Sequence, residues 1–478
     1  MKSKFAKRTV SLMLALLLVL IPFSAVFAVS VQNEAKTPYI LIRGFMSSTI
    51  YADKDDPDSE QVWPPKTGDI VSTVFKVLPS LLNVIITKNF DRFSDKGLPI
   101  ITDLLMAAGL DESGNASNGT GPHFIYPSAE EIRSGKDLEF LYDWRLDPTE
   151  IAPELDKFIS YVTEAAGTDK VCIECRSFGG VIALTYAGIY GSEKIKNIVF
   201  NASAVYGAGF AGGLFNGGMT FDEEALSEFL KAAFAYNKNE KLLNGLFGFL
   251  GKIGLMGKVC GFLNDFIAES GDRLMKESLF PVFGCWPSTW AMVSSDAYDN
   301  ADNFVYNTLF AGDNKYAGLR EKAENFDSLI RQNREDILAD INENSGLYII
   351  SKHGFCSMFM TDAWTVPGDM VLECEDTSFG ATVAPYGKAL GDAELAGTDA
   401  EYISPAKNIN ASTCLYPEQT WFIENVTHSK VFDEVFDFTK KLLYSDEQLT
   451  VAAMKADGYA RFMYLDKTNG KLIDASAK

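Results

Sequence analysis

The chain has 478 residues, with 43 basic and 64 acidic side chains and a formal net charge of −21 at pH 7. A chain this acidic does not bind nucleic acid or an anionic membrane through general electrostatics, so we expect no nucleic-acid partner. The length exceeds one typical domain and fits one enzyme core with a large insertion.

The first 28 residues have the pattern of a secretory signal. Four basic residues precede an apolar run that reaches about Ile21, and Val26 and Ala28 occupy the −3 and −1 positions of a cleavage site. The run is shorter than the ~20 residues that a membrane span needs. We therefore expect residues 1–28 to be removed and the protein to be secreted, with an uncleaved anchor helix as the alternative.

Strands alternate with helices in two blocks of the chain, which predicts an α/β protein with a mostly parallel sheet covered on both faces. Gly191 is a natural stop for the second helix. The expected strands lie at 38–43, 137–148, 170–175, 195–203 and 346–352, and the expected helices at 149–166 and 179–190. We assign the core of this fold to residues 29–206 and 346–450.

Residues 207–345 are helical in pattern and rich in glycine. Such glycines let another backbone approach, or they weaken a helix by ~1 kcal/mol each. We expect either the helical core of a second subdomain or an apolar lid over a lipid site, which would contact a lipid surface transiently. Lys252 and Lys258 argue against a membrane span. Five glycines recur at every third position: Gly245, Gly248, Gly251, Gly254 and Gly257.

The C-terminal residues 451–478 include a pattern typical of a β-hairpin. Residues 459–474 are apolar on both sides of Asn469-Gly470, a pair that favours a two-residue hairpin turn. We expect this hairpin to be a flap that covers the core.

Ser177 lies between a β-branched run and a glycine pair, in the sequence Cys175-Arg176-Ser177-Phe178-Gly179. This resembles the G-x-S-x-G strand–turn–helix elbow that exposes a nucleophilic serine, with Cys in place of the first Gly. A serine that caps a helix is the other interpretation. The elbow interpretation needs a base and an acid elsewhere in the chain.

The base is selected from three histidines. In folds with this elbow the order along the chain is Ser, acid, His. His123 precedes the serine, and His353 leaves no room for an acid before it, so His428 is the candidate. The candidates for the acid are Asp362, Asp369 and Asp376. Asp369 is best placed, because it follows a glycine in an expected turn that leads into an apolar strand, and Asp376 is the second choice.

Two backbone N–H groups are needed to stabilise a developing oxyanion. Phe178 follows the nucleophile, and Phe45 follows Gly44 after the first strand, so we expect these two residues to form the oxyanion hole.

Neither a metal nor a cofactor is expected. The histidines lack ligand spacing, and the chain has no phosphate loop or dinucleotide turn. The seven cysteines are odd in number and form no framework, and Cys172 and Cys175 fit packing inside a buried strand better than redox or metal chemistry.

Three segments together resemble the lecithin:cholesterol acyltransferase-like branch of the α/β-hydrolases. "ILIRGFMSS" is similar to that family's oxyanion loop, "YDWRLDP" to its Tyr-Asp-Trp-Arg-Leu signature, and "CRSFGGVIALTYA" to its elbow and following helix. Asp369 stands where the family has Gly-Asp-Gly-Thr-Val, and His428 matches its late histidine. The likeness spans residues 38–206 and 346–445.

This chain departs from the family pattern at four positions. Arg43 replaces Pro, Cys175 replaces Gly, Arg176 replaces His and Met370 replaces Gly. The resemblance implies an α/β-hydrolase fold and a Ser177–Asp369–His428 enzyme that transfers or hydrolyses lipid acyl groups through an acyl-serine intermediate. The alternatives are an acyltransferase, an amidase or peptidase, and a non-catalytic lipid- or surface-binding protein on a decayed hydrolase fold.

Charged residues within the expected strands need partners, because a lone buried charge is costly. Arg43 and Glu174 stand near the same end of two strands that neighbour each other in this fold. We therefore predict that Arg43 forms an ion pair with Glu174 (or Arg176) behind the site, and the alternative is that each charged side chain reaches solvent separately.

Overall fold

The structure is a computed structural model that describes residues 37–87 and 89–478. The expected signal, residues 1–28, lies outside the described residues.

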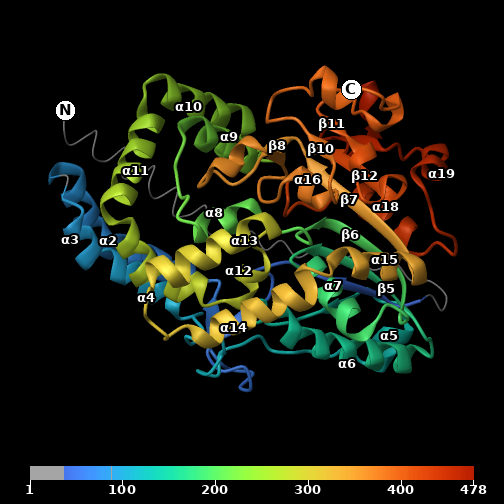
Figure 1. Ribbon diagram of the computed structural model, residues 1–478, viewed down its shortest axis with the longest axis horizontal. Coiled ribbons are helices and arrows are strands. Elements are labelled where there is room, and N and C mark those ends of the chain that lie inside the picture. Colours follow the sequence, from blue (N-terminus) through green and yellow to red (C-terminus); the bar gives the residue numbers. More distant parts are fainter. Residues whose placement is uncertain (1–36, 88) are drawn as a thin grey trace.

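An eight-stranded sheet forms the centre of the molecule, as Figure 1 shows. Seven strands run parallel, and β14 pairs antiparallel at one edge. The expected mixed α/β fold with a largely parallel sheet is therefore confirmed. In spatial order the strands are β14 (Lys471–Asp474), β13 (Phe462–Asp466), β12 (Thr420–Glu424), β7 (Gly346–His353), β6 (Ile195–Ser203), β5 (Val171–Ser177), β1 (Tyr39–Ile42) and β4 (Leu138–Phe140).

Alternate side chains of each central strand enter two separate cores. In β6, Ile198 and Phe200 pack in one core and Val199 in the other, as the two-residue period of a strand requires. Helices α6 (Pro148–Ala166), α7 (Gly179–Tyr190) and α15 (Arg334–Asn344) cover the first face, and α18 (Asp433–Leu443) covers the second. Further short helices of the core segments are α5 (Ala129–Arg133), α16 (Cys374–Thr377) and α17 (Asp392–Leu395), and α19 (Val451–Ala456) precedes the C-terminal hairpin.

The ends of α6 show how the sequence sets element bounds. Asp147 accepts a hydrogen bond from the Thr149 N–H at 2.8 Å, Pro148 occupies the first turn, and Gly167 ends the helix in the left-handed conformation. By contrast, α7 is apolar on nearly every side, because it is buried between the sheet and neighbouring helices.

The interval between β6 and β7 is helical, as expected. Its last helix, α15, packs against α7 and β7, so this part of the expected insertion covers the sheet instead of forming a separate cap. The other elements are α8 (Gly209–Phe215), α9 (Glu223–Ala233), α10 (Glu240–Lys252), α11 (Leu255–Leu274), η1 (Met275–Gly284), α12 (Pro287–Ala291), α13 (Ser295–Asp302), η2 (Asn303–Leu309), α14 (Ala317–Phe326) and η3 (Asp327–Arg331).

A second helical excursion lies inside the segment that we assigned wholly to the core. Helices α2 (Thr67–Thr87), α3 (Asp91–Lys96) and α4 (Leu98–Met106) pack against α11 and η1 through a shared apolar cluster that includes Phe90, Leu98 and Phe266. Three two-stranded sheets complete the described core segments: β2 (Ile50–Tyr51) pairs with β3 (Gln61–Trp63), β8 (Phe355–Cys356) with β9 (Pro367–Gly368), and β10 (Thr382–Val383) with β11 (Ile409–Asn410).

The C-terminal hairpin forms as expected, but its turn has four residues, 467–470, and the hairpin does not form a flap. β13 pairs parallel with β12 and antiparallel with β14, so the hairpin extends the central sheet. The expectation of a covering flap is wrong, because the apolar residues of β13 are needed to continue the sheet.

The glycines of α10 do not admit another backbone. A side-chain carbon added at Gly245, Gly248 or Gly251 would meet nothing within 4 Å. These glycines therefore weaken α10 without a packing reason. Among the described residues no single helix has the length and apolar character to span a membrane, although α10 and the α11–η1 segment pass that test as a pair bent by 68°.

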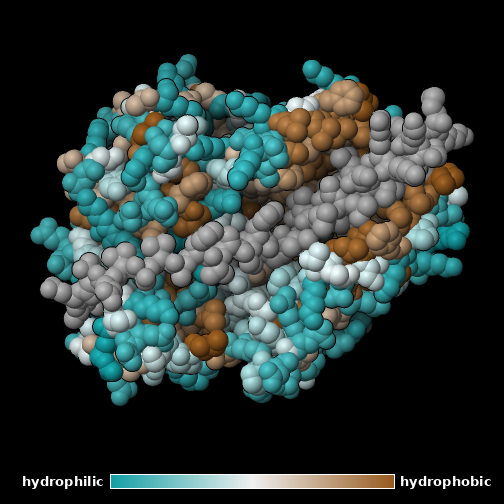
Figure 2. Space-filling view, turned by 180° about the vertical axis from the view of Figure 1, so that it is seen from behind, coloured by the Kyte–Doolittle hydropathy of each residue, from teal (hydrophilic) through white to brown (hydrophobic). Residues whose placement is uncertain are grey.

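Exposed apolar side chains gather on the part of the molecule formed by α2 and α10. Figure 2 shows brown patches on this side, seen from behind. On α10 they follow one helical stripe, and the same area includes residues of α2. The exposed side chains are Leu242, Leu246, Phe249, Ile253, Val71, Phe75 and Ile86.

Candidate active site

Ser177 lies at a sharp turn between β5 and α7. Its φ of +54° is in the left-handed region, which non-glycine residues adopt only where the surroundings impose it. The helix begins directly after Phe178 and has no side-chain cap, so the interpretation of Ser177 as a helix cap is wrong. The turn has the form of a strained strand–turn–helix elbow.

Small residues after Ser177 allow this turn to form. A side-chain carbon at Gly179 would overlap the carbonyl oxygen of Ile42, and one at Gly180 would lie 2.5 Å from the Cβ of Ser203. The glycine pair therefore lets α7 start against both neighbouring strands.

We expect Gly179→Ala to lower the free energy of unfolding by about 2–4 kcal/mol, because the added methyl group has no space against β1. Urea unfolding would measure this loss. The matched control is Gly245→Ala, which adds a methyl group in open space on α10 and should stabilise the protein by up to ~1 kcal/mol. Equal stabilities for the two variants would contradict the packing argument.

The loop after β1 lies directly against the serine. A Cβ at Gly44 would be 2.5 Å from the Cβ and 2.8 Å from the Oγ of Ser177. The rings of Phe45 and Phe178 pack edge to face, with their centroids 6.1 Å apart. The structure thus brings the two residues expected to form the oxyanion hole to the same side of the elbow.

The "YDWR" segment holds this loop in place. The Tyr142 hydroxyl donates to the Arg43 carbonyl at 2.6 Å, and the Trp144 indole N–H donates to the Ser48 carbonyl at 2.9 Å. Asp143 and Arg145 form a two-pronged buried ion pair that fixes the segment itself. Both ends of the loop that carries Phe45 are therefore anchored by side chains from one tetrapeptide.

His428 and Asp369 form a close pair. The Nδ1 of His428 lies 2.6 Å from Oδ2 of Asp369, and the His428 backbone N–H donates to the Asp369 carbonyl at 2.8 Å. The other carboxylate oxygen accepts from the N–H groups of Val371 and Leu372. Asp369 is fully buried and is held as an acceptor from both sides.

The second-choice acid lies elsewhere. Asp376 lies in α16, and burial raises its pKa well above the ordinary value. The structure pairs His428 with Asp369 and not with Asp376. No strand follows Asp369, contrary to our expectation, because Met370 adopts a φ of +88° and turns the chain.

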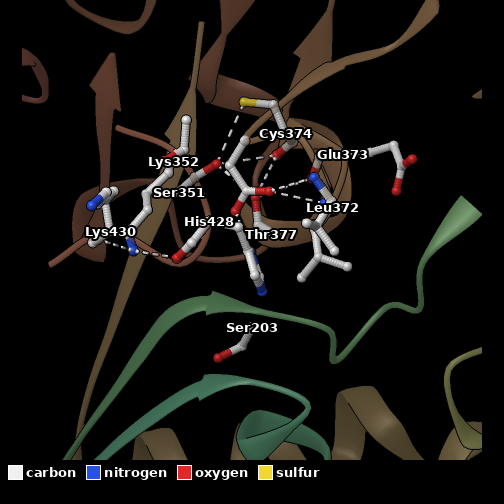
Figure 3. Close-up of polar contacts among 12 residues, drawn as sticks. Ser203, Ser351, Lys352, Leu372, Glu373, Cys374, Thr377, His428 and Lys430 are labelled. Carbon is white, nitrogen blue, oxygen red and sulfur yellow. Dashed lines mark hydrogen bonds and ion pairs between the residues drawn. The ribbon is translucent and has the colours of Figure 1, made fainter. Parts of the chain in front are cut away.

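The free end of the His428 ring faces the strand ends. Figure 3 shows the ring below Leu372 and Glu373, pointing toward Ser203. Ser203 is the register partner of Ser177 in the parallel pair β5–β6, so both serines lie at the same end of the sheet. Within the described residues the Ser177 hydroxyl makes no hydrogen bond to the ring, as is common in unliganded sites.

The other two histidines lie apart from this arrangement. His123 stacks on Tyr51 with a centroid distance of 3.7 Å, and burial lowers the pKa of His353 to about 4. Among residues 37–87 and 89–478, no group of three or more His, Cys, Asp or Glu side chains is arranged to hold a metal ion.

The predicted ion pair of Arg43 with Glu174 or Arg176 is wrong, because Arg43 turns to another partner and Glu174 and Arg176 pair with each other. Arg43 pairs with Glu139 of β4 at 2.8 Å, because β4 lies on the other side of β1. Glu174 pairs with Arg176 and accepts from the Tyr39 hydroxyl at 2.7 Å and from Asn201 at 2.9 Å. Burial opposes ionisation, but Arg176 and these hydrogen bonds lower the pKa of Glu174 below its ordinary value.

Glu373 is a buried acid that the sequence did not single out. It follows the Asp369 turn and accepts from the Gly209 N–H at 3.0 Å, while its other oxygen has no hydrogen-bond partner. Burial raises the pKa of Glu373 to about 7, so the folded protein keeps this carboxyl neutral in acid. In the sequence nothing distinguishes Glu373 from an ordinary solvent-exposed acid next to a turn.

We expect Glu373→Gln to remove a pH dependence of stability. Between pH 4.5 and about 7 the folded state holds a proton that the unfolded chain has lost, so the contribution of Glu373 to stability falls as pH rises through 7. The neutral variant should match wild type at pH 4.5 and exceed it by ~3 kcal/mol at pH 8.5. Urea unfolding at both pH values tests this, with Glu401→Gln as the surface control; parallel curves for wild type and Glu373→Gln would contradict it.

Comparisons with known proteins identify no family for the chain. No model of a protein family matches it, and no curated protein matches it. Among solved structures, a chain of "The crystal structure of Tle4-Tli4 complex" aligns at 14% identity with a TM-score of 0.21. The alignment covers 38% of this chain and only 48% of that chain.

Proposed function

We propose that this protein is a secreted serine hydrolase of the α/β-hydrolase fold that cleaves carboxylic esters, in particular lipid acyl esters. The observation that carries the proposal is the 2.6 Å pair of Asp369 with His428, whose ring faces the strand ends where Ser177 occupies a strained elbow. An elbow after a central strand, with the acid and base on later loops, supports this fold and mechanism.

In the proposed mechanism Ser177 attacks the acyl carbon as His428 takes the hydroxyl proton. Asp369 holds the ring so that Nδ1 carries a proton and the other nitrogen is free to act as the base. The backbone N–H groups of Phe45 and Phe178 stabilise the negative charge on the acyl oxygen. His428 then gives its proton to the leaving alcohol, and water, activated by the same ring, releases the acid from the acyl-serine.

The apolar surroundings favour a substrate with a long acyl chain. The loop after β1 and the turn at Asp369 carry partly buried apolar side chains, which pack against two apolar clusters. Helices α2 and α10 add exposed apolar surface. An apolar surface of this kind suits a lipid substrate or transient contact with a lipid surface. The side chains nearest to the catalytic turns are Phe45, Met46, Met370 and Val371.

A panel of p-nitrophenyl esters of increasing chain length tests the activity. We expect turnover above the buffer rate, with kcat/KM rising as the acyl chain lengthens. Product analysis with a lipid alcohol acceptor separates a hydrolase, which releases free acid, from an acyltransferase, which forms a new ester. A folded protein that cleaves no ester of the panel, and transfers no acyl group, would favour the non-catalytic binder.

A further inference from the structure

The loop that carries His428 is held by a side chain from the helical interval between β6 and β7. Tyr236 follows the end of α9, and its hydroxyl donates to the Asn425 carbonyl at 2.8 Å. The same hydroxyl accepts from the backbone N–H of Thr427 at 3.0 Å. One phenol thus bridges the two peptide groups on either side of Val426, shortly before His428.

This loop needs such support because its backbone is unusual. Asn425 has a φ of +69°, and its N–H and side chain are used to tie it to His353 and to Leu465. After Thr427 the chain must turn so that the ring of His428 meets Asp369. A shift of the Thr427 peptide would therefore move the ring.

Tyr236 is itself fixed from several sides. Its ring packs edge to face against Phe432 with centroids 5.3 Å apart, and the Lys467 ammonium lies 4.9 Å from its centroid. Lys467 also donates to the Ala235 carbonyl at 3.1 Å, which ties the end of α9 to the C-terminal hairpin. Burial raises the pKa of Tyr236 to about 12, so the hydroxyl keeps its proton at neutral pH.

A second contact reaches the same loop from inside the sheet. The Lys352 ammonium, at the end of β7, lies 3.3 Å from the His428 carbonyl, and burial lowers its pKa to about 8. Lys352 holds the loop beyond His428, and Tyr236 holds it before His428. The two supports come from different parts of the chain, and Tyr236 is the one of the two that connects the loop to the inserted helices.

We propose that Tyr236 is a positioning residue for His428, through which the helical insertion sets the orientation of the catalytic base. The inference rests on the proposed function. If Tyr236 has this role, the segment between α9 and α10 belongs to the site, whereas the exposed apolar stripe of α10 does not take part in positioning His428.

The test is Tyr236→Phe, which removes the hydroxyl and keeps the ring contact with Phe432. We expect kcat to fall about 10- to 100-fold while KM changes less than about threefold. The matched control is Tyr190→Phe on the exposed end of α7, which should retain the wild-type kcat. Unchanged kcat in Tyr236→Phe, in a wild type that cleaves esters, would overturn the inference.

A spectroscopic readout separates positioning from loss of fold. The chain has only three histidines, so the low-field proton resonance of the ring that binds Asp369 is readily assigned. We expect this resonance to shift or broaden in Tyr236→Phe and to stay in place in Tyr190→Phe, with the rest of the spectrum unchanged. An unshifted resonance would contradict the inference. A wild type without esterase activity would instead defeat the proposed function and leave this spectral test in force.

Discussion

Ser177→Ala is expected to lower kcat for ester cleavage by about 10⁵-fold and to leave the fold intact. The hydroxyl is the proposed nucleophile, and loss of a triad nucleophile removes the covalent path while oxyanion binding remains. The side chain is small and lies at the open end of β5 against Gly44, so its truncation leaves no large cavity. Steady-state kinetics with a p-nitrophenyl ester measures the loss.

The sharpest control for this variant is Ser203→Ala. Ser203 lies toward the His428 ring in Figure 3, but it is fully buried and donates to the Cys175 carbonyl at 2.9 Å. A hydroxyl already used in this way is a poor candidate for a nucleophile, and we expect Ser203→Ala to stay within about tenfold of wild type. A larger loss of kcat in Ser203→Ala than in Ser177→Ala would contradict the assignment of Ser177 as the nucleophile.

Asp369→Asn is expected to lower kcat by about 10⁴-fold, because it reverses the tautomer of His428. An asparagine can still accept from the N–H groups of Val371 and Leu372, so the turn is retained. Its amide N–H₂ would then face Nδ1 of the ring and donate to it. The proton would move to the other ring nitrogen, which could no longer take the proton of Ser177.

The matched control is Asp376→Asn, seven residues further along the chain. Its half-buried carboxyl does not pair with His428, so activity should stay within about threefold of wild type even where stability changes. Kinetics and thermal unfolding on both variants separate the two effects. Comparable losses of kcat in both variants would contradict the assignment of Asp369 as the acid.

The core elements could be predicted because their signals are local. β5, α7 and β6 have the expected bounds to within two residues, since β-branched runs, Gly191 and the apolar period act over short distances. The pairing of Asp369 with His428 was also predicted, although 59 residues separate them. This prediction followed from the order of the residues along the chain and from the turn residues around Asp369. Neither segment alone indicates that the two side chains are in contact.

The errors concern partners that depend on which strands are neighbours. Arg43 pairs with Glu139 and not with Glu174. β1 has a neighbouring strand on each side, and the sequence does not indicate on which side Arg43 finds its partner. The hairpin β13–β14 extends the sheet because a parallel edge was open beside β12. Both outcomes are decided by tertiary packing.

The supporting residues of the site were not predicted for a related reason. Tyr236 and Lys352 act through backbone groups of a loop about 190 and 76 residues away. Glu373 differs from the exposed acids of the chain by its burial. A tyrosine, a lysine and a glutamate carry no local signal of such roles, which appear only when the fold brings them to the loops of His428 and Asp369.

Labelling with a fluorophosphonate, followed by peptide mapping, shows whether Ser177 is a nucleophile activated by His428. The reagent bonds to a serine whose hydroxyl is activated by a neighbouring base. We expect one adduct, on the peptide that contains Ser177, and we expect it to be absent in Ser177→Ala and to form much more slowly in His428→Ala. A folded wild-type protein that takes no label, or takes it on a serine other than Ser177, would contradict this expectation.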